Sequence, residues 1–190
     1  MGHPQRSDQP QGRRARPGDP DQRRARAAAG GSERRARIIS ARVRAADSVD
    51  LPITPGQLWQ VLEEAEAWPP WSYVTRMTWT GPGPLGVGST RAVETRSGGR
   101  VIDEVIAWHP QMHMAFRVNA VSVPTEGASV EEFRIEPTPR GCRLTWTLAH
   151  DPKQASLGVK LIARPVMNAK HRQYMAKLGK YTEQRFGISI

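Results

Sequence analysis

The residues whose types and spacing are best suited to chemistry lie toward the C-terminus. Asn168 precedes His171 by three residues, so the two side chains fall on one face of a helix. An amide and an imidazole can each donate and accept hydrogen bonds, which suits the pair to orient the polar group of a bound molecule. A lone histidine on a helix face is more often a hydrogen-bonded core residue, and the sequence leaves both interpretations open.

Two neighbouring carboxylates are the next candidates. In the expected strand 100–108, Glu104 shares a face with Ile102, and Asp103 shares the other face with Val105. If the first face points inward, apolar surroundings raise the pKa of Glu104 and make it a candidate general acid or base. Alternation alone does not decide between the faces, and a solvated or ion-paired carboxylate is the alternative for both residues.

Other chemistry has little support in the sequence. It lacks the HExxH and CxxC motifs, and Gly86-Val87-Gly88 lacks the strand and helix of a phosphate-binding loop. No group of histidines and carboxylates has the spacing of metal ligands, so we expect no metal and no other cofactor. Three tyrosines remain as acid or base candidates, with no spacing that brings them to one point: Tyr73, Tyr174 and Tyr181.

Positive charge is concentrated at the N-terminus. Residues 1–37 hold ten arginines and four acidic residues, a net charge of +6, whereas the other 153 residues carry +4. This segment contains no Val, Leu, Ile, Phe, Tyr or Trp, so we expect it to be disordered. RRAR recurs at 13–16, 23–26 and 34–37, which would suit binding of nucleic acid or anionic lipid through residues 6–37. The composition favours a solvated tail over such a role.

The remaining residues, 38–190, are expected to form one domain, because two would each have too small a core. The single cysteine, Cys142, excludes an intrachain disulfide and favours a reducing compartment. No apolar run approaches the roughly 20 residues that span a bilayer, and no apolar segment follows the N-terminus as in a secretory signal. We therefore expect a cytoplasmic protein without a transmembrane segment.

Hydrophobic periodicity predicts a strand, a helix with a short helical turn after it, six more strands and a long helix. Residues 38–51 alternate as a strand, and Thr54, Pro55 and Gln57 form the capping box and first turn of a helix that ends before Pro69. Six further segments alternate as strands: 73–80, 89–97, 100–108, 112–118, 128–137 and 142–150.

The last segment, 157–186, has helical periodicity with one mostly apolar stripe, and Pro165 is expected to kink or divide the helix. The strands place apolar side chains on one face and polar ones on the other, as in an antiparallel sheet covered on one side. We expect the last helix to provide that cover. Trp68-Pro69-Pro70-Trp71 is expected to make a stiff reversal of the chain, with both rings as buried anchors.

The order of elements and several motifs resemble the SRPBCC superfamily, which includes START and Bet v 1-like proteins. The motifs are the helix opening ITPGQLWQVL, Trp71 shortly after that helix, Gly86-Val87-Gly88 and the stretch EVIAWHPQMHMAFRV. The chain most resembles the branch described as polyketide cyclase/dehydrase or lipid transport, over roughly Ala41 to Phe186. The resemblance implies an α+β helix-grip fold, in which a curved seven-stranded antiparallel sheet wraps around the long C-terminal helix in the order β-α-α-β6-α.

The resemblance also implies an apolar cavity between sheet and helix, and with it the binding or transport of a hydrophobic small molecule such as a lipid, a quinone or a polyketide. Methionines beside a cavity would give a soft and adaptable lining. The side chains expected to contact the ligand are Met77, Trp79, Trp108, Met112, Met114, Phe116, Phe133, Trp146, Leu161, Asn168, His171 and Met175.

Two other functions fit the sequence. One is an aromatase/cyclase or dehydratase that acts on a bound polyketide and needs a general acid and base at one spot, with Glu104 and His171 as candidates. The other is an interaction module whose arginine-rich tail holds a polyanion. Loss of turnover with retained binding in a His171→Ala variant would distinguish the enzyme from a carrier.

Overall fold

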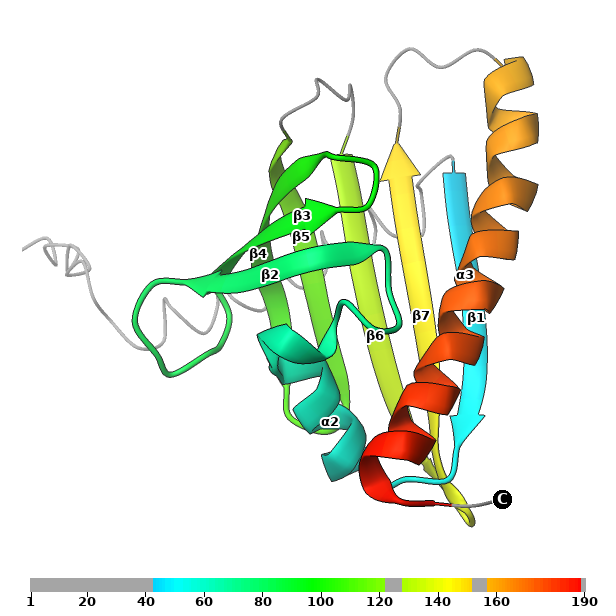
Figure 1. Ribbon diagram of the computed structural model, residues 1–190. Coiled ribbons are helices and arrows are strands. Elements are labelled where there is room, and N and C mark those ends of the chain that lie inside the picture. Colours follow the sequence, from blue (N-terminus) through cyan, green and yellow to red (C-terminus); the bar gives the residue numbers. More distant parts are fainter. Residues whose placement is uncertain (1–42, 122–127, 152–156, 189–190) are drawn as a thin grey trace, which may run out of the picture. The chain divides into compact units, whose positions relative to one another are not determined.

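The computed structural model describes residues 43–121, 128–151 and 157–188, and these form seven strands and two α-helices (Figure 1). The segment 1–37 and the first residues of the expected strand at 38–42 lie outside the described residues. The strands are β1 (Val43–Leu51), β2 (Val74–Thr80), β3 (Thr90–Thr95), β4 (Arg100–His109), β5 (His113–Val121), β6 (Ala128–Thr138) and β7 (Gly141–Asp151). The helices are α2 (Pro55–Glu63), the short 3-10 helix η1 (Ala65–Ala67) and α3 (Leu157–Phe186).

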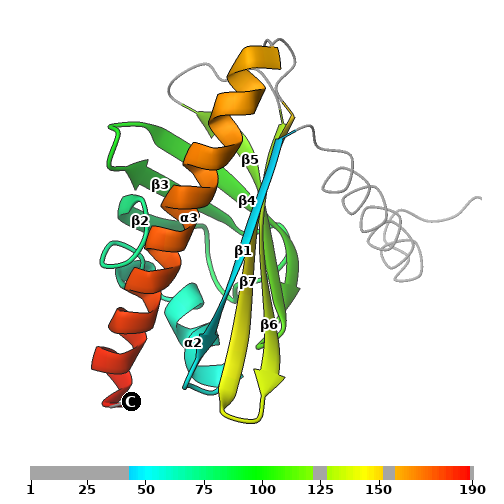
Figure 2. The same ribbon diagram turned by 90° about the vertical axis from the view of Figure 1, so that its right-hand side faces the viewer.

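All seven strands belong to one antiparallel sheet in the order β1-β7-β6-β5-β4-β3-β2. The first strand, β1, lies at one edge of the sheet and pairs with the last strand, β7. The sheet is curled, so that β2 and β3 cross in front of the long strands β4 to β6, and α3 runs along β1 (Figures 1 and 2). The α+β helix-grip architecture expected from the sequence is confirmed.

Helix α2 begins where the sequence predicted. The Thr54 hydroxyl accepts a hydrogen bond from the Gln57 backbone N–H at 3.2 Å, and the Gln57 side chain accepts one from the Thr54 N–H at 2.9 Å. This capping box satisfies two N–H groups that the first turn would otherwise leave unpaired. The helix buries one face against the sheet: Leu58, Trp59, Val61 and Leu62.

The segment Trp68-Pro69-Pro70-Trp71 reverses the chain between η1 and β2, as expected. Both indole rings are fully buried, and the Trp68 Nε1–H donates to the Leu62 carbonyl at 3.0 Å. Arg96, from the turn after β3, donates to the carbonyls of Pro69 at 2.5 Å and Ser72 at 3.2 Å. The reversal is therefore tied both to the helix before it and to the sheet after it.

The inner face of the sheet carries the main core, and the outer face is only partly polar. Ile106, Ala115, Val130 and Ala149 are buried on the outer side and form a second, smaller apolar cluster. The expectation of a uniformly wet outer face is wrong at these positions, because small and branched side chains on neighbouring strands shield one another there.

A bulge in β4 interrupts its alternation, so Asp103 and Trp108 point to the same side of the sheet. The pairing with β5 shifts between Val105 and Ala107. The extra residue changes the alternation, so Asp103, Val105 and Trp108 all face the main core. Of the two faces that alternation left open, the one with Asp103 and Val105 points inward, and Glu104 points outward.

Helix α3 continues without interruption through Pro165, so the alternative in which this proline divides the helix is wrong. After Pro165 in the sequence, one side of the helix is buried, and its residues are His171, Met175, Leu178 and Thr182. Their packing against the sheet compensates for the one backbone hydrogen bond that a proline removes.

The turn between β6 and β7 requires glycine at its last position. Gly141 has a φ of 145°, and a Cβ there would overlap the carbonyl oxygen of Leu51 and crowd Ile53. We expect Gly141→Ala to lower the free energy of unfolding by about 2 kcal/mol, measured by urea denaturation. Gly86→Ala is the control, because a Cβ at Gly86 meets nothing within 4 Å, and an equal loss in both variants would contradict the steric argument.

Candidate functional site

Aromatic rings line the inner face of the sheet and contact one another. Phe133 stacks on Trp146 with ring centres 5.4 Å apart, and it meets Phe116 edge to face at 6.3 Å. Most of the expected ligand-contacting side chains gather here and are buried or half-buried: Met77, Trp79, Trp108, Met114, Phe116, Phe133, Trp146 and Met175. They pack together as a core over much of this face, rather than all lining an open space.

A buried arginine lies at the centre of this apolar face. Arg91 on β3 is 1% exposed, and its guanidinium pairs with Asp103 on β4 at 2.9 Å and with Glu131 on β6 at 2.7 Å. The face of its guanidinium lies 3.5 Å from the centre of the Phe116 ring. Strands β4 and β5 separate β3 from β6 in the sheet, so the pair with Glu131 crosses the concave interior. The ion-pair cluster therefore helps to fix how tightly the sheet curls.

Burial of the charged groups of this cluster carries a high desolvation penalty. Burial would lower the pKa of Arg91, but the charges of Asp103 and Glu131 raise it instead, so the guanidinium stays charged. Burial raises the pKa of Glu131 to about 7 and also raises that of Asp103, while Arg91 acts in the opposite direction on both. The Asp103 Oδ1 atom has no hydrogen-bond partner among the described residues. Glu131 is therefore a carboxyl group that can bind a proton near neutral pH.

Glu131 connects the cluster to aromatic side chains that contact α3. Its Oε1 atom accepts a hydrogen bond from the Trp146 indole at 3.1 Å and a long one from the Tyr73 hydroxyl at 3.5 Å. Burial, reinforced by the charge of Glu131, raises the pKa of Tyr73 well above its usual value, so its phenol remains a donor. The Tyr73 ring in turn contacts Tyr174 of α3, with ring centres 6.2 Å apart.

His171 of α3 lies flat against Trp146, with ring centres 4.2 Å apart and planes 19° from parallel. The residue is 4% exposed, and neither ring nitrogen has a hydrogen-bond partner among the described residues. The Oδ1 atom of Asn168, on the turn before, is also buried and lacks such a partner. Burial lowers the pKa of His171, which the charge of Asp47 only partly offsets, so the imidazole is neutral at pH 7. The pair expected from the sequence is thus brought together with free hydrogen-bonding capacity.

Two expected site residues are placed elsewhere. Glu104 faces outward, where its carboxylate accepts hydrogen bonds from Arg117 at 2.6 Å and Asn119 at 2.8 Å, so it is not a candidate acid in an apolar cavity. Met112 lies in the turn before β5 and is 66% exposed, so it does not contact an internal ligand. The side chain of Leu161 lies outside the described residues, and its proposed role stays a prediction.

Arg91 and Glu131 were missed as site residues, although the sequence contains a signal for each. Arg91 alternates in phase with Val93, and Glu131 alternates in phase with Phe133 and Ile135. A charged residue in phase with the apolar side of its strand is an inward charge that needs a partner. The partners lie 12 and 40 positions away from Arg91, which strand alternation alone does not reveal.

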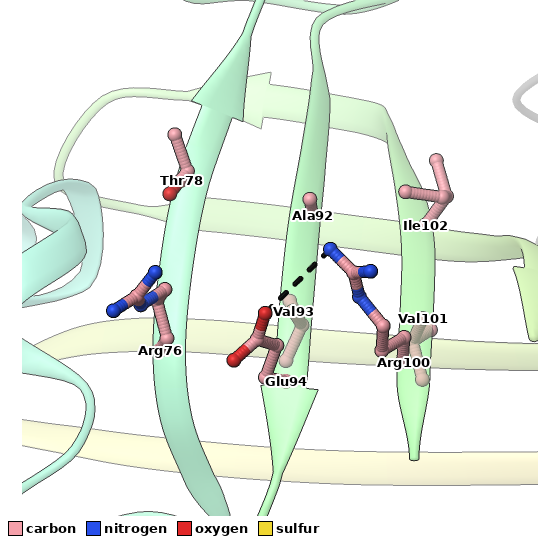
Figure 3. A pocket seen from close by; sticks show the side chains of 8 residues that line it. All are labelled: Arg76, Thr78, Ala92, Val93, Glu94, Arg100, Val101 and Ile102. Atoms are coloured by element: carbon pink, nitrogen blue, oxygen red, sulfur yellow. Dashed lines mark ion pairs between the residues drawn. The ribbon is translucent and has the colours of Figure 1, made fainter. Parts of the chain in front are cut away.

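The outer face of the sheet carries a separate hollow of about 220 Å³ over β2, β3 and β4 (Figure 3). Its outward side chains are Arg76, Thr78, Ala92, Glu94, Arg100 and Ile102, and Glu94 pairs with Arg100 at 3.6 Å. None of the side chains expected to contact a ligand lines it. Its charged rim makes it a poor match for an apolar molecule.

Within the described residues, no helix is both long and apolar enough to cross a membrane. In the same part of the chain, no group of three His, Cys, Asp or Glu side chains is arranged to hold a metal ion. The candidate site therefore consists of aromatic rings, the buried ion-pair cluster, and the polar atoms of His171 and Asn168.

The sequence matches a known family and two mycobacterial relatives. Residues 42–183 match the family described as polyketide cyclase / dehydrase and lipid transport. Uncharacterized proteins of Mycobacterium tuberculosis and Mycobacterium bovis are each 43% identical to it over 144 residues, which is 75% of this chain and 86% of theirs.

Solved structures with low sequence identity have the same fold. Protein MLL2253 from Mesorhizobium loti is 20% identical with a TM-score of 0.59, over 74% of this chain and 97% of that one. Ara h 8.0201 is 13% identical with a TM-score of 0.58, over 74% and 97% of the two chains. DynU16, a protein of the dynemicin biosynthetic locus, is 14% identical with a TM-score of 0.58, over 74% of this chain and 47% of that one.

Proposed function

The chain belongs to the polyketide cyclase/dehydrase and lipid transport family, and from this premise we propose that it binds an apolar small molecule beside α3. The half-buried Tyr73 and Tyr174 provide aromatic surface for the molecule, and His171 with Asn168 holds its polar group. The lipid, quinone or polyketide classes expected from the sequence all combine such an apolar body with a polar group.

The observation that carries this proposal is the unsatisfied pair of ring nitrogens on His171. Buried polar groups in folded proteins are nearly always hydrogen-bonded, because a lost partner costs about 1–3 kcal/mol. A histidine that served the core alone would be paired with a neighbouring side chain or carbonyl. Here the imidazole, which is 4% exposed, and the Asn168 Oδ1 atom both lack one within the described chain. A ligand with a polar end would supply the missing hydrogen bonds.

Replacement of His171 by phenylalanine tests the proposal. The phenyl ring keeps the stacking on Trp146 and removes both nitrogens, so we expect at least about tenfold weaker binding of naphthol, used as a probe with an aromatic body and one hydroxyl. The melting temperature of the ligand-free variant should not fall, because no hydrogen bond within the described fold is lost. Calorimetric titration gives the affinity, and a thermal melt gives the stability.

The control for this experiment is Gln173→Ala, an exposed position on the same helix. It should leave both affinity and melting temperature unchanged. A large drop in the melting temperature of ligand-free His171→Phe would show that the imidazole is a structural core residue. Native mass spectrometry of the purified full chain provides a second test, since a carrier is expected to retain an apolar molecule.

One observation supports the enzyme alternative as a second candidate. Glu131, whose pKa is raised to about 7 by burial, contacts the Tyr73 hydroxyl, and a carboxyl group with such a pKa suits proton transfer at neutral pH. In a cyclase or dehydratase, Tyr73→Phe would reduce turnover about 100-fold or more while leaving binding intact. In a carrier, the same substitution changes affinity only. The interaction-module alternative rests on residues 6–37, which lie outside the described residues.

A further inference from the structure

Asp47 lies beside the proposed polar end of the ligand site. In the pairing of β1 with β7 it stands directly opposite Trp146. Residues that face each other in an antiparallel pair project to the same side of the sheet, so Asp47 projects to the inner side that Trp146 occupies. The His171 ring is stacked on that same indole. One Asp47 oxygen accepts a hydrogen bond from the Ser48 N–H at 2.9 Å.

The negative charge of Asp47 acts electrostatically on the imidazole of His171. Burial lowers the pKa of His171, and the Asp47 carboxylate raises it again by a smaller amount, as a nearby negative charge does. The half-buried position of Asp47 means that water screens this charge less than at an open surface. Any polar group bound at His171 therefore lies in a negative potential.

Among the described residues, the buried cation of the inner face is not available to compensate a second negative charge at this point. Arg91, the buried cation of the described core, is already held by Asp103 at 2.9 Å and Glu131 at 2.7 Å. Its remaining amino group is directed at the Met77 sulfur at 3.7 Å. A carboxylate or phosphate at His171 would meet Asp47 and the Asn168 oxygen rather than a free cation.

We propose that Asp47 is a specificity-determining residue, which restricts the site to ligands whose polar end is neutral and donates a hydrogen bond, such as a hydroxyl group. A neutral imidazole accepts such a bond on its unprotonated nitrogen, and the Asn168 oxygen can accept another. Ligands that end in a carboxylate are rejected by the like charge of Asp47. This inference rests on the proposed function and names the class of molecule that the site takes.

Two pairs of probes test the inference on the full chain by calorimetry at neutral pH. Naphthol and naphthoate share one aromatic body, and decanol and decanoate share one alkyl chain, so within each pair only the polar end differs. The wild-type protein should bind the alcohol of the pair it accepts at least about tenfold more tightly than the acid. This comparison needs no variant and stands even if substitutions at Asp47 impair folding.

The variant Asp47→Asn identifies the cause of the preference. It removes the charge and keeps the shape, so the acid should gain most of the lost affinity while the alcohol stays within about twofold. Asp50→Asn is the matched control, because Asp50 lies on the same strand but is paired with Arg143 at 2.7 Å on the exposed side. It should leave the ratio of the two affinities unchanged.

The outcomes separate the inference from the function on which it rests. If the acid binds the wild-type chain as tightly as the alcohol, or if Asp47→Asn leaves their ratio unchanged, the role of Asp47 is overturned while ligand binding stands. If neither alcohol nor acid of either pair binds, the proposed function fails and the inference fails with it. A strong preference for the alcohol that disappears in Asp47→Asn supports both.

Discussion

Replacement of Arg91 by methionine is expected to lower the free energy of unfolding by about 3–5 kcal/mol at neutral pH. The substitution removes the cation and leaves its two carboxyl partners in the core. Asp103 and Glu131 both lie on the inner face and are 3% exposed, and they lose the cation that holds them at 2.9 and 2.7 Å. Each group would then keep an uncompensated buried charge or take up a proton that the unfolded chain releases at neutral pH, and both cost stability.

The loss should depend on pH, which distinguishes it from a simple packing defect. Without Arg91 the pKa values of both carboxyl groups rise further, because the guanidinium is what lowers them in the wild-type protein. Acidification protonates them and removes the buried charge, so the variant should recover much of its stability near pH 5, roughly one pH unit above the usual carboxyl range. A cavity or overpacking defect would persist at both pH values.

The control is the same substitution at Arg134. This residue also pairs with a glutamate, Glu132, at 2.6 Å, but its side chain is 49% exposed. Exposed ion pairs contribute about 1 kcal/mol or less, so Arg134→Met should have a small effect that varies little with pH. Urea denaturation at two pH values measures all three proteins. Equal losses in the two variants would show that the buried cluster stabilises the fold no more than a surface pair does.

The fold was predictable from the sequence wherever capping residues and hydrophobic periodicity indicate the same element. The capping box of Thr54 and Gln57 defines the start of α2, and strict alternation on β7 places Leu144 and Trp146 inward. The resemblance to the SRPBCC superfamily, drawn from a few such positions, is confirmed by the family match over residues 42–183. These features depend on residues close together in the sequence, where sterics and hydrogen bonding act directly.

The candidate site was less predictable because it depends on contacts between distant strands. The bulge between Val105 and Ala107 brings Trp108 to the same side as Asp103 and Val105, and no residue at the bulge signals it in the sequence. The partnership of Arg91 with Glu131 depends on the curl of the sheet, which is a property of all seven strands together. His171 was predictable, since helical spacing alone places it on the buried stripe of α3.

The buried cluster and the proposed ligand site meet at Trp146. Its indole donates to Glu131 at 3.1 Å, and one face of its ring stacks on His171. The carboxylate thus fixes the indole that in turn supports the imidazole. The cluster therefore holds this indole in one orientation, which is a structural role for an ion pair that is costly to bury.

Glu131→Gln is expected to remove a pH dependence of stability that the wild-type protein shows between about pH 4.5 and 7. Burial raises the pKa of Glu131 from 4.5 to about 7, with Arg91 opposing the rise. In this window the folded protein holds a proton that the unfolded chain has released. Stability is therefore lost as pH increases through it, by on the order of 3 kcal/mol in total. Glutamine has no proton to lose, so relative to wild type the variant should become more stable as pH rises.

The pH dependence of the stability of Glu131→Gln must be compared with that of wild type, because the titration of His171 changes stability in the opposite direction. Burial lowers the pKa of its imidazole, so the unfolded chain binds a proton more readily and stability is lost as pH falls below about 6.5. The wild-type curve contains both contributions, whereas the difference between wild type and Glu131→Gln isolates the carboxyl group.

Glu132→Gln is the matched control on the adjacent residue. Burial raises the pKa of Glu132, but hydrogen bonds from His113 and Arg134 outweigh burial and lower it. The pKa of Glu132 is lowered rather than raised, so its variant should not gain stability relative to wild type as pH rises through this window. A constant difference for Glu131→Gln would show that Glu131 does not take up a proton in the folded protein, and that the carboxylate stays charged beside Arg91 at every pH in the window.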